Sequence, residues 1–138
     1  MTQKKNGIIC EYYDTTKIKL CYNYFIFNNK REGGYESYYK NGQSSVICNY
    51  KNNKVEGEYK SYYENGQLGM IFNSKNYKRE GKYKSYHVNG QIEMICNYIN
   101  GKLNGVFEDY NINGQLRILC HYKDDKLERR IMILNIKI

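Results

Sequence analysis

Cysteine and histidine are the residues of this chain that could bind a metal ion or act as nucleophiles. The five cysteines are well separated, and no two of them form a C-x-x-C pair. The two histidines, His87 and His121, do not stand at the spacings that zinc ligands adopt. The chain also has no G-x-S-x-G, H-E-x-x-H or Walker motif. We therefore expect no catalytic residue, no metal site and no cofactor, and we do not expect an enzyme.

Three of the cysteines, Cys48, Cys96 and Cys120, occupy the same place in a repeat of 24 residues, and Phe72 occupies it in the repeat after Cys48. Adjacent β-strands lie about 4.8 Å apart, so equivalent positions on successive hairpins should be about 9.6 Å apart. A disulfide requires Cα atoms within roughly 7 Å of each other. We therefore predict five free thiols, with these three packed in a core where phenylalanine can replace them.

Tyrosine and lysine offer binding chemistry in place of catalysis. The chain has 138 residues, a formal net charge of +8 and 17 tyrosines. Twelve of its 22 basic residues lie in the connections between repeats, against six acidic residues there. If these connections lie along one edge of a sheet, that edge should carry a positive stripe. The candidate binding surface comprises Tyr38, Tyr62, Tyr86, Tyr110, Lys54, Lys78, Arg79, Lys102 and Lys126.

The basic stripe has three interpretations. Turns are solvated, and lysine is common in them for that reason alone. The stripe, or the row of tyrosines, could instead dock a protein partner, because tyrosine buries a large area with little loss of rotamer freedom. The third interpretation is nucleic acid or anionic lipid, whose phosphates lysine neutralises and whose bases tyrosine can stack on. Only this third interpretation predicts binding that weakens steeply as salt rises.

The elements that must position these residues are β-hairpins, because no segment has the 3.6-residue apolar period of a helix. Two signals recur at steps of 24 residues: Asn-Gly-Gln at 41–43, 65–67, 89–91 and 113–115, and a glycine at positions 33, 57, 81 and 105. Asn-Gly between tyrosine-rich and apolar runs predicts a two-residue type I′ turn. Such a turn would place Tyr39 opposite Ser44 and Tyr35 opposite Cys48.

Side chains alternate between the two faces of a strand, so this register predicts one apolar and one mixed, hydrated face. The predicted apolar face carries Tyr35, Val46, Cys48, Tyr59, Leu68, Met70, Phe72, Tyr83, Ile92, Met94, Cys96, Phe107, Leu116, Ile118 and Cys120. A single layer must cover that face, either by curling under its own twist or by packing against a second copy. We favour curling, with a homodimer formed through an edge strand as a further expectation.

The repeat Gly-x-Tyr-x-Ser-Tyr-Tyr-x-Asn-Gly-Gln resembles the MORN (membrane occupation and recognition nexus) repeat in its variant form, over about residues 7–128. The resemblance implies an all-β fold, an elongated and twisted antiparallel meander of stacked hairpins, as a single-layer sheet or open half-barrel. We expect a single repeat domain over residues 1–138. Its repeats span about 7–32, 33–56, 57–80, 81–104 and 105–128, followed by a capping strand at 129–138.

The resemblance also sets the expected function. Proteins of this kind are mostly scaffolds, are sometimes lipid-associated and are often dimeric; some bacterial relatives are antitoxin-like, and stand-alone relatives occur in giant viruses. We therefore expect a non-catalytic protein–protein interaction module. The alternatives are an adaptor for anionic lipid or nucleic acid through the basic edge, and an antitoxin-like neutraliser of a toxin protein.

The expected location is cytoplasmic, and for a viral protein it is the host cytoplasm or the virion. The N-terminus has no apolar segment of the kind that secretory signals contain. No run of about 18 apolar residues is present that could form a transmembrane helix.

Overall fold

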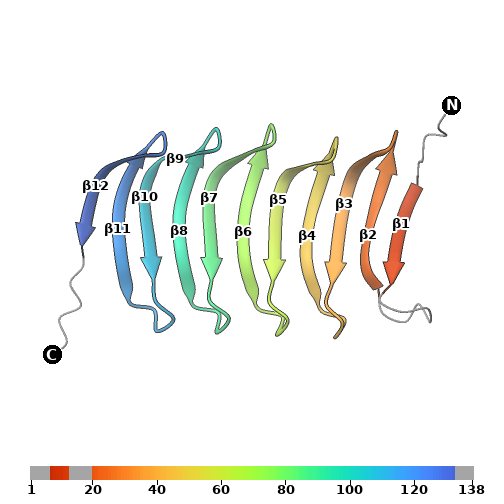
Figure 1. The fold of residues 1–138 in the computed structure, drawn as a ribbon, viewed down its shortest axis with the longest axis horizontal. Helices are drawn as coiled ribbons and strands as arrows, with labels where there is room; N and C mark the ends of the chain where they lie inside the picture. The colour runs from red at the N-terminus through yellow and green to blue at the C-terminus, as the bar shows by residue number, and fades with distance from the viewer. Residues whose placement is uncertain (1–6, 13–19, 133–138) are drawn as a thin grey trace.

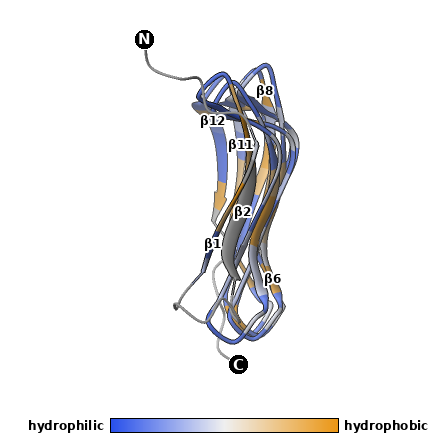
Figure 2. Ribbon diagram, turned by 90° about the vertical axis from the view of Figure 1, so that its right-hand side faces the viewer, coloured by the Kyte–Doolittle hydropathy of each residue, from blue (hydrophilic) through white to orange (hydrophobic). Residues whose placement is uncertain are grey.

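The computed structural model describes residues 7–12 and 20–132, and these residues form one open β-sheet. They contain no helix, and their twelve strands pair antiparallel. The strand order follows the chain from β1 to β8 and then from β10 to β12, while β9 pairs with β8. Figure 1 shows a row of hairpins, and Figure 2 shows a sheet one layer thick that bends in profile. The predicted antiparallel meander is confirmed.

The strands follow the repeat, with two strands to each unit. The first hairpin is formed by β1 (Gly7–Tyr12) and β2 (Leu20–Phe27). The remaining strands are β3 (Lys30–Tyr38), β4 (Ser44–Lys51), β5 (Lys54–Tyr62), β6 (Leu68–Lys75), β7 (Lys78–Tyr86), β8 (Ile92–Ile99), β9 (Lys102–Leu103), β10 (Gly105–Tyr110), β11 (Leu116–Lys123) and β12 (Lys126–Met132). Residues 133–138 of the predicted capping strand lie outside the described residues.

Two-residue turns connect each repeat to the next along one edge, which we call the turn edge. It consists of the turns at 28–29, 52–53, 76–77, 100–101 and 124–125 (Figure 1). In the second turn, Asn52 and Asn53 have φ angles of 53° and 67°. Both are positive, as a type I′ turn requires. Asparagine, aspartate and glycine tolerate this conformation, and four of the five turns consist of these residues alone.

The Asn-Gly sequences form a different loop, and the prediction of a two-residue type I′ turn there was wrong. The Tyr39 amide donates to the Gln43 carbonyl oxygen over 2.8 Å, and the Gly42 amide donates to the Tyr39 carbonyl oxygen over 2.9 Å. Gly42 has a φ of 89°, whereas Asn41 does not have a positive φ. This is a type I turn closed by a left-handed glycine. The loops at 39–43, 63–67, 87–91 and 111–115 form the loop edge.

A bulge beside each of these loops changes the register. Tyr38 pairs with Ser44 and Ser37 pairs with Val46, so Ser45 is the extra residue. The predicted Tyr39–Ser44 pair is therefore wrong, whereas the pairing of Tyr35 with Cys48 is confirmed. The same shift pairs Leu68 with Tyr62, Ile92 with Tyr86 and Leu116 with Tyr110. These three aliphatic residues lie on the face opposite to the one predicted.

The two faces of the sheet differ in burial. The cysteine face carries a central row formed by Tyr35, Cys48, Tyr59, Phe72, Tyr83, Cys96, Phe107 and Cys120. The opposite face carries Tyr38, Tyr62, Tyr86 and Tyr110. All described residues that are buried lie on the cysteine face: Cys48, Ser74, Tyr83, Ser85, Cys96, Asp109 and Cys120. Among them, Cys96 is only 2 % exposed, so the cysteine face holds what core the sheet has.

The sheet does not close on itself, so curling does not cover the cysteine face. In the described part of the chain, β1 and β12 end the strand order and do not pair with each other. Closing a barrel requires the register to stagger around the sheet. Here Cys48 pairs with Tyr35 on one side and Tyr59 on the other, and Tyr59 pairs with Phe72. Equivalent residues thus stay in line, and the stagger needed for closure does not accumulate.

The Asn-Gly-Gln loops link each repeat to its neighbour. The Asn41 side-chain amide donates to the Glu64 carbonyl oxygen of the next loop over 2.7 Å. Gln43 packs against Gly66, with its Oε1 only 2.7 Å from where a Cβ on that glycine would lie. The same amide contact recurs from the third and fourth repeats to the loops that follow them. The recurring triplet is therefore explained by packing between repeats.

Candidate functional site

The predicted binding residues lie on two separate surfaces. Tyr38, Tyr62, Tyr86 and Tyr110 end their strands beside the loop edge, on the opposite face. Lys54, Lys78, Lys102 and Lys126 begin their strands at the turn edge. Along β5, Lys54 and Tyr62 are eight positions apart in the sequence, and this corresponds to about 26 Å at the usual rise of a strand. A ligand must span the full width of the sheet to contact both sets.

Pairs of lysines face each other across the turn edge. Lys51 pairs with Lys54 at one turn and Lys75 pairs with Lys78 at the next. The last turn repeats the arrangement with Lys123 opposite Lys126. Like charges directly opposite each other destabilise a sheet. The sequence places this unfavourable pairing at three of the five turns, which concentrates positive charge along the edge.

The acidic residues of the turn edge do not neutralise these lysines. Glu32 accepts the Asn52 amide over 2.8 Å, and Glu80 accepts the Asn100 amide over 2.8 Å. Glu56 holds the turn between them in the same way. Among the described residues the ion pairs are Lys60–Glu58, Arg117–Asp109 and His121–Glu128. None contains a lysine of the turn edge, so these carboxylates support the turns and do not neutralise the lysines.

Arg79 does not belong to the lysine stripe, although the sequence grouped it there. It lies on the cysteine face, where its Cζ is 5.0 Å from the Phe72 ring centroid and 5.2 Å from the Tyr83 ring centroid. Its Nη1 donates to the Tyr98 hydroxyl over 3.2 Å. Such contacts are cation–π interactions. Arg79 therefore covers the aromatic row and presents its charge above that face.

Tyr77 at the third turn is a feature that sequence reasoning missed. Its φ is 64°, a conformation that is strained for a bulky residue. The ring is 42 % exposed, and Lys54 Nζ lies 4.8 Å from its centroid. The sequence did contain a signal for it, because Tyr77 stands at the second position of a turn. The other described turns have Asn29, Asn53, Gly101 or Asp125 at that position. An aromatic ring thus projects from the middle of the lysine stripe.

The four tyrosines of the opposite face are half-buried, and all but Tyr38 pair with an aliphatic residue of the neighbouring strand. Beside Tyr62 and Leu68, the next row pairs Lys60 with Ile71, and the following repeat continues with Lys84 opposite Ile95. Ile47 on the same face is 38 % exposed. Sequence reasoning missed Leu68, Ile92 and Leu116 on this face because the bulge is not visible in a simple alternation. The face presents apolar rows interrupted by charges.

The cysteines, histidines and carboxylates of the described residues are not grouped as the ligands of a metal ion would be. No group of three or more His, Cys, Asp or Glu among them could hold a metal ion. Cys10, Cys48, Cys96 and Cys120 are free thiols, and the Cys21 side chain lies outside the described side chains. Burial raises the pKa of Cys48 and of Cys96, which keeps both as unreactive thiols near neutral pH.

The histidines make structural contacts, and membrane-spanning helices are absent from the described residues. His87 Nε2 lies 2.9 Å from the Tyr110 carbonyl oxygen, and His121 Nδ1 lies 2.9 Å from Glu128 Oε2. In the described part of the chain, no helix is long and apolar enough to cross a membrane.

Comparison with known proteins agrees with this architecture. Four consecutive segments match the family model described as MORN repeat variant: residues 31–52, 55–76, 79–100 and 103–124. Together the matched segments cover more than half of the chain. No curated protein matches the chain.

Proposed function

Since the chain belongs to the MORN repeat variant family, we propose that it is a non-catalytic module that binds another protein through its opposite face. The observation that supports this most strongly is the row of half-buried tyrosines, each paired across the strand with an aliphatic residue or serine. Tyrosine is enriched in protein interfaces because its ring is large and rigid and its hydroxyl can form a hydrogen bond with water or with a partner protein.

Charges on this face would set the specificity of the contact. Glu36, Lys60, Lys84 and Glu108 stand in the row beside the tyrosines, on alternate strands. Complementary charges across an interface select partners more than they strengthen binding. A partner that fits would carry apolar anchors for the tyrosine row, with acidic groups near the two lysines and basic groups near the two glutamates.

The experiment is a comparative pull-down from native host extract, washed at high salt. The bait variants are wild type, a Tyr62→Ser/Tyr86→Ser double variant on the opposite face, and a Lys75→Gln/Lys78→Gln control at the turn edge. We expect one protein to be retained by wild type and by the control, and to be lost with the tyrosine variant. Equal retention by all three baits, with folding verified by circular dichroism, would refute the use of this face.

A second function is favoured by the lysine pairs of the turn edge. Unneutralised cations in line, with Tyr77 among them, suit an anionic lipid surface or nucleic acid. The test is binding to phosphatidylserine vesicles and, separately, to an oligo-dT strand over a range of salt concentrations. We expect binding that falls steeply with salt and is lost in the Lys75→Gln/Lys78→Gln variant. Binding to neither ligand at low salt would mean that these lysines are only solvated turn residues.

A further inference from the structure

The third repeat lacks a side chain that the second, fourth and fifth repeats use on the cysteine face. In those repeats the extra residue of the bulge bonds to the side chain eight positions before it, over 2.8 to 3.0 Å. These pairs are Ser37 with Ser45, Ser85 with Glu93 and Asp109 with Arg117. The third repeat has Ser61 and Gly69 at the same two positions. The Ser61 hydroxyl therefore has no bulge side chain to bond.

An open hollow lies at this position, in the half of the cysteine face beside the loop edge. Its volume is about 370 Å³, and its lining includes Ser61 and Gly69 together with Ser85 and Glu93 of the next repeat. Sites for small ligands have volumes of this order. The glycine thus leaves a space of ligand size between two repeats.

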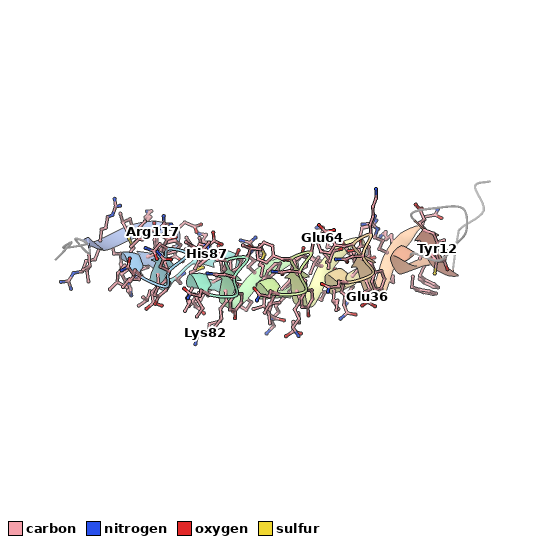
Figure 3. The ribbon with its side chains drawn as sticks, turned by 90° about the horizontal axis from the view of Figure 1, so that it is seen from below. Tyr12, Glu36, Glu64, Lys82, His87 and Arg117 are labelled. Atoms are coloured by element: carbon pink, nitrogen blue, oxygen red, sulfur yellow. The ribbon has the colours of Figure 1, made fainter. Side chains whose placement is uncertain are left out.

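The hollow is accessible from outside the sheet. Arg117 stands in its repeat where Gly69 stands in the third, and it projects to one side of the sheet in Figure 3. Lys82, on the opposite face, projects to the other side. In Figure 2 no described strand or loop crosses the cysteine face, so no described element covers the hollow.

Two tyrosine rings line the hollow, and their hydroxyls are already used. The Tyr39 hydroxyl donates to the Tyr62 carbonyl oxygen over 2.6 Å, and the Tyr63 hydroxyl donates to the Tyr86 carbonyl oxygen over 2.7 Å. Tyr63 Cε2 is 3.4 Å from where a Cβ on Gly69 would lie. The rings are therefore held in place and present aromatic carbon to a ligand. The faces of such rings attract cations.

Glu93 brings one negative charge to the hollow. It is half-buried and accepts the Ser85 hydroxyl over 2.9 Å, and none of the ion pairs among the described residues includes it. Burial, and then the charge of Glu93, raise the pKa of Tyr63, so this charge acts across the hollow. Arg117 at the equivalent position of the next repeat is held by Asp109. The Glu93 carboxylate is thus left without a counter-ion, and this favours a cationic ligand.

A single carboxylate suits a singly charged organic cation. Calcium and magnesium need several oxygen ligands, and no group of three or more His, Cys, Asp or Glu among the described residues could hold a metal ion. An ammonium group can donate to the Glu93 carboxylate and to the Ser61 hydroxyl together, while its carbon stem contacts Met70. We propose that the hollow binds an alkylammonium group, the cation of a lysine side chain or of a free primary amine, with Glu93 as its counter-ion.

A titration of the full chain with n-butylammonium chloride, followed by amide chemical shifts, tests the proposal. n-Butanol is the matched control, because it has the same apolar stem without the charge. We expect saturable shifts at Gly69 and Met70 with butylammonium and much smaller shifts with butanol. Nα-acetyl-lysine methylamide, titrated in the same way, distinguishes the sources of the cation. Its binding would assign the site to a lysine side chain, and its failure while butylammonium binds would assign it to a free amine. Equal shifts with butanol, or no saturable shift with either cation, would refute the site.

Removing the charge of Glu93 should weaken binding without changing the shape of the hollow. Glu93→Gln retains an oxygen that can accept the Ser85 hydroxyl. Its affinity for butylammonium should fall about tenfold, because a hydrogen bond to a charged group is lost. The matched control is Glu108→Gln on the opposite face, which changes the net charge equally and should bind as wild type does. Equal affinity for the two variants would contradict the role of Glu93.

Filling the hollow should abolish binding while the sheet stays folded. Gly69 does not have a positive φ, and Ser45 stands at the equivalent position of the second repeat, so Gly69→Ser fits the backbone. The added hydroxyl would bond to Ser61 and occupy the place of the ammonium group. If Gly69→Ser is folded by circular dichroism and still binds butylammonium, the ligand binds elsewhere and the proposal is wrong. Both variants keep Tyr62 and Tyr86, so failure of this site is distinguishable from failure of the proposed function.

Discussion

The turn edge and the loop edge join the same repeats by different chemistry. On the loop edge, neutral amides reach the next loop and a glutamine packs over its glycine. On the turn edge, carboxylates accept the backbone amides of the next turn while lysines face one another across it. The loop edge therefore uses its polar groups for assembly of the sheet. The lysines of the turn edge are not used in this way, so their positive charge is available to a ligand.

The largest effect on the free energy of unfolding is expected from alkaline pH, because it ionises the buried cysteines and tyrosines in the strands between the two edges. Burial raises the pKa of Cys48, Cys96, Tyr59 and Tyr83 in the folded chain above the ordinary values of 9.0 for cysteine and 10.0 for tyrosine. Groups of this kind stabilise the fold fully below their unfolded pKa, and the stabilisation is lost as pH rises through the folded pKa. Urea unfolding should therefore show falling stability above about pH 9. A midpoint unchanged up to pH 11 would contradict the burial of this row.

A methyl group added to a glycine of the loop edge should have the next largest effect on the free energy of unfolding. Gly66 has a φ of 84°, and a Cβ there would lie 2.7 Å from Gln43 Oε1. Gly66→Ala should reduce the free energy of unfolding by about 1–2 kcal/mol, from left-handed strain and displaced packing. The matched control is Gly34→Ala in β3, because Gly34 has ordinary backbone angles and its nearest Cβ neighbour is 3.9 Å away. Chemical denaturation of both variants should separate them; equal effects would show that the loop contact is not important.

Removing one amide at the loop edge should have a smaller effect. Asn65 Nδ2 donates to the Val88 carbonyl oxygen over 2.9 Å, and its Oδ1 accepts the Gln67 amide over 3.0 Å. Asn65→Ala should lower the free energy of unfolding by about 1 kcal/mol, since both bonds are exposed to competing water. Asn65→Asp keeps only the acceptor and should fall between wild type and the alanine variant. The reverse order would assign the effect to the loop conformation and not to contact between repeats.

The smallest expected change is a gain at the turn edge. Lys75→Glu replaces the like-charge pair with Lys78 by an opposite-charge pair. Its melting temperature should rise by about 1–3 °C at low salt, and the gain should shrink at high salt. The same substitution should weaken binding to anionic vesicles or oligo-dT if the stripe is a ligand site. A loss of stability would mean that Lys75 has a structural role at this turn.

Much of the fold could be predicted because the repeat is regular, but contacts between repeats could not. The recurrence of Asn-Gly-Gln at steps of 24 residues indicated hairpins and a meander. The sequence Asn-Gly is compatible with more than one type of tight turn. The type that forms depends on which residues close the loop, and here the loop is closed by the hydrogen bond from the Tyr39 amide to the Gln43 carbonyl oxygen. Because that choice fixes the bulge, the side on which Leu68 lies could not be known in advance.

The candidate surfaces were predictable only in part for a similar reason. The lysine stripe follows from the positions of the turns along the chain. The direction of Arg79 depends on rings contributed by three strands, and the exposure of Tyr77 depends on a backbone angle at its turn. Neither property can be read from the composition of a single repeat.

The unstaggered register gives the sheet a constant spacing between equivalent surface positions. Since equivalent residues stay in line from one hairpin to the next, each surface feature recurs about every 9.6 Å along the long axis. A peptide in the polyproline II conformation has three residues per turn and advances about 3.1 Å per residue, so the same side of it would meet equivalent positions of the sheet about every third residue. The sheet would thus select a linear partner by the spacing between its binding residues. Each further repeat would add one more binding position at the same spacing.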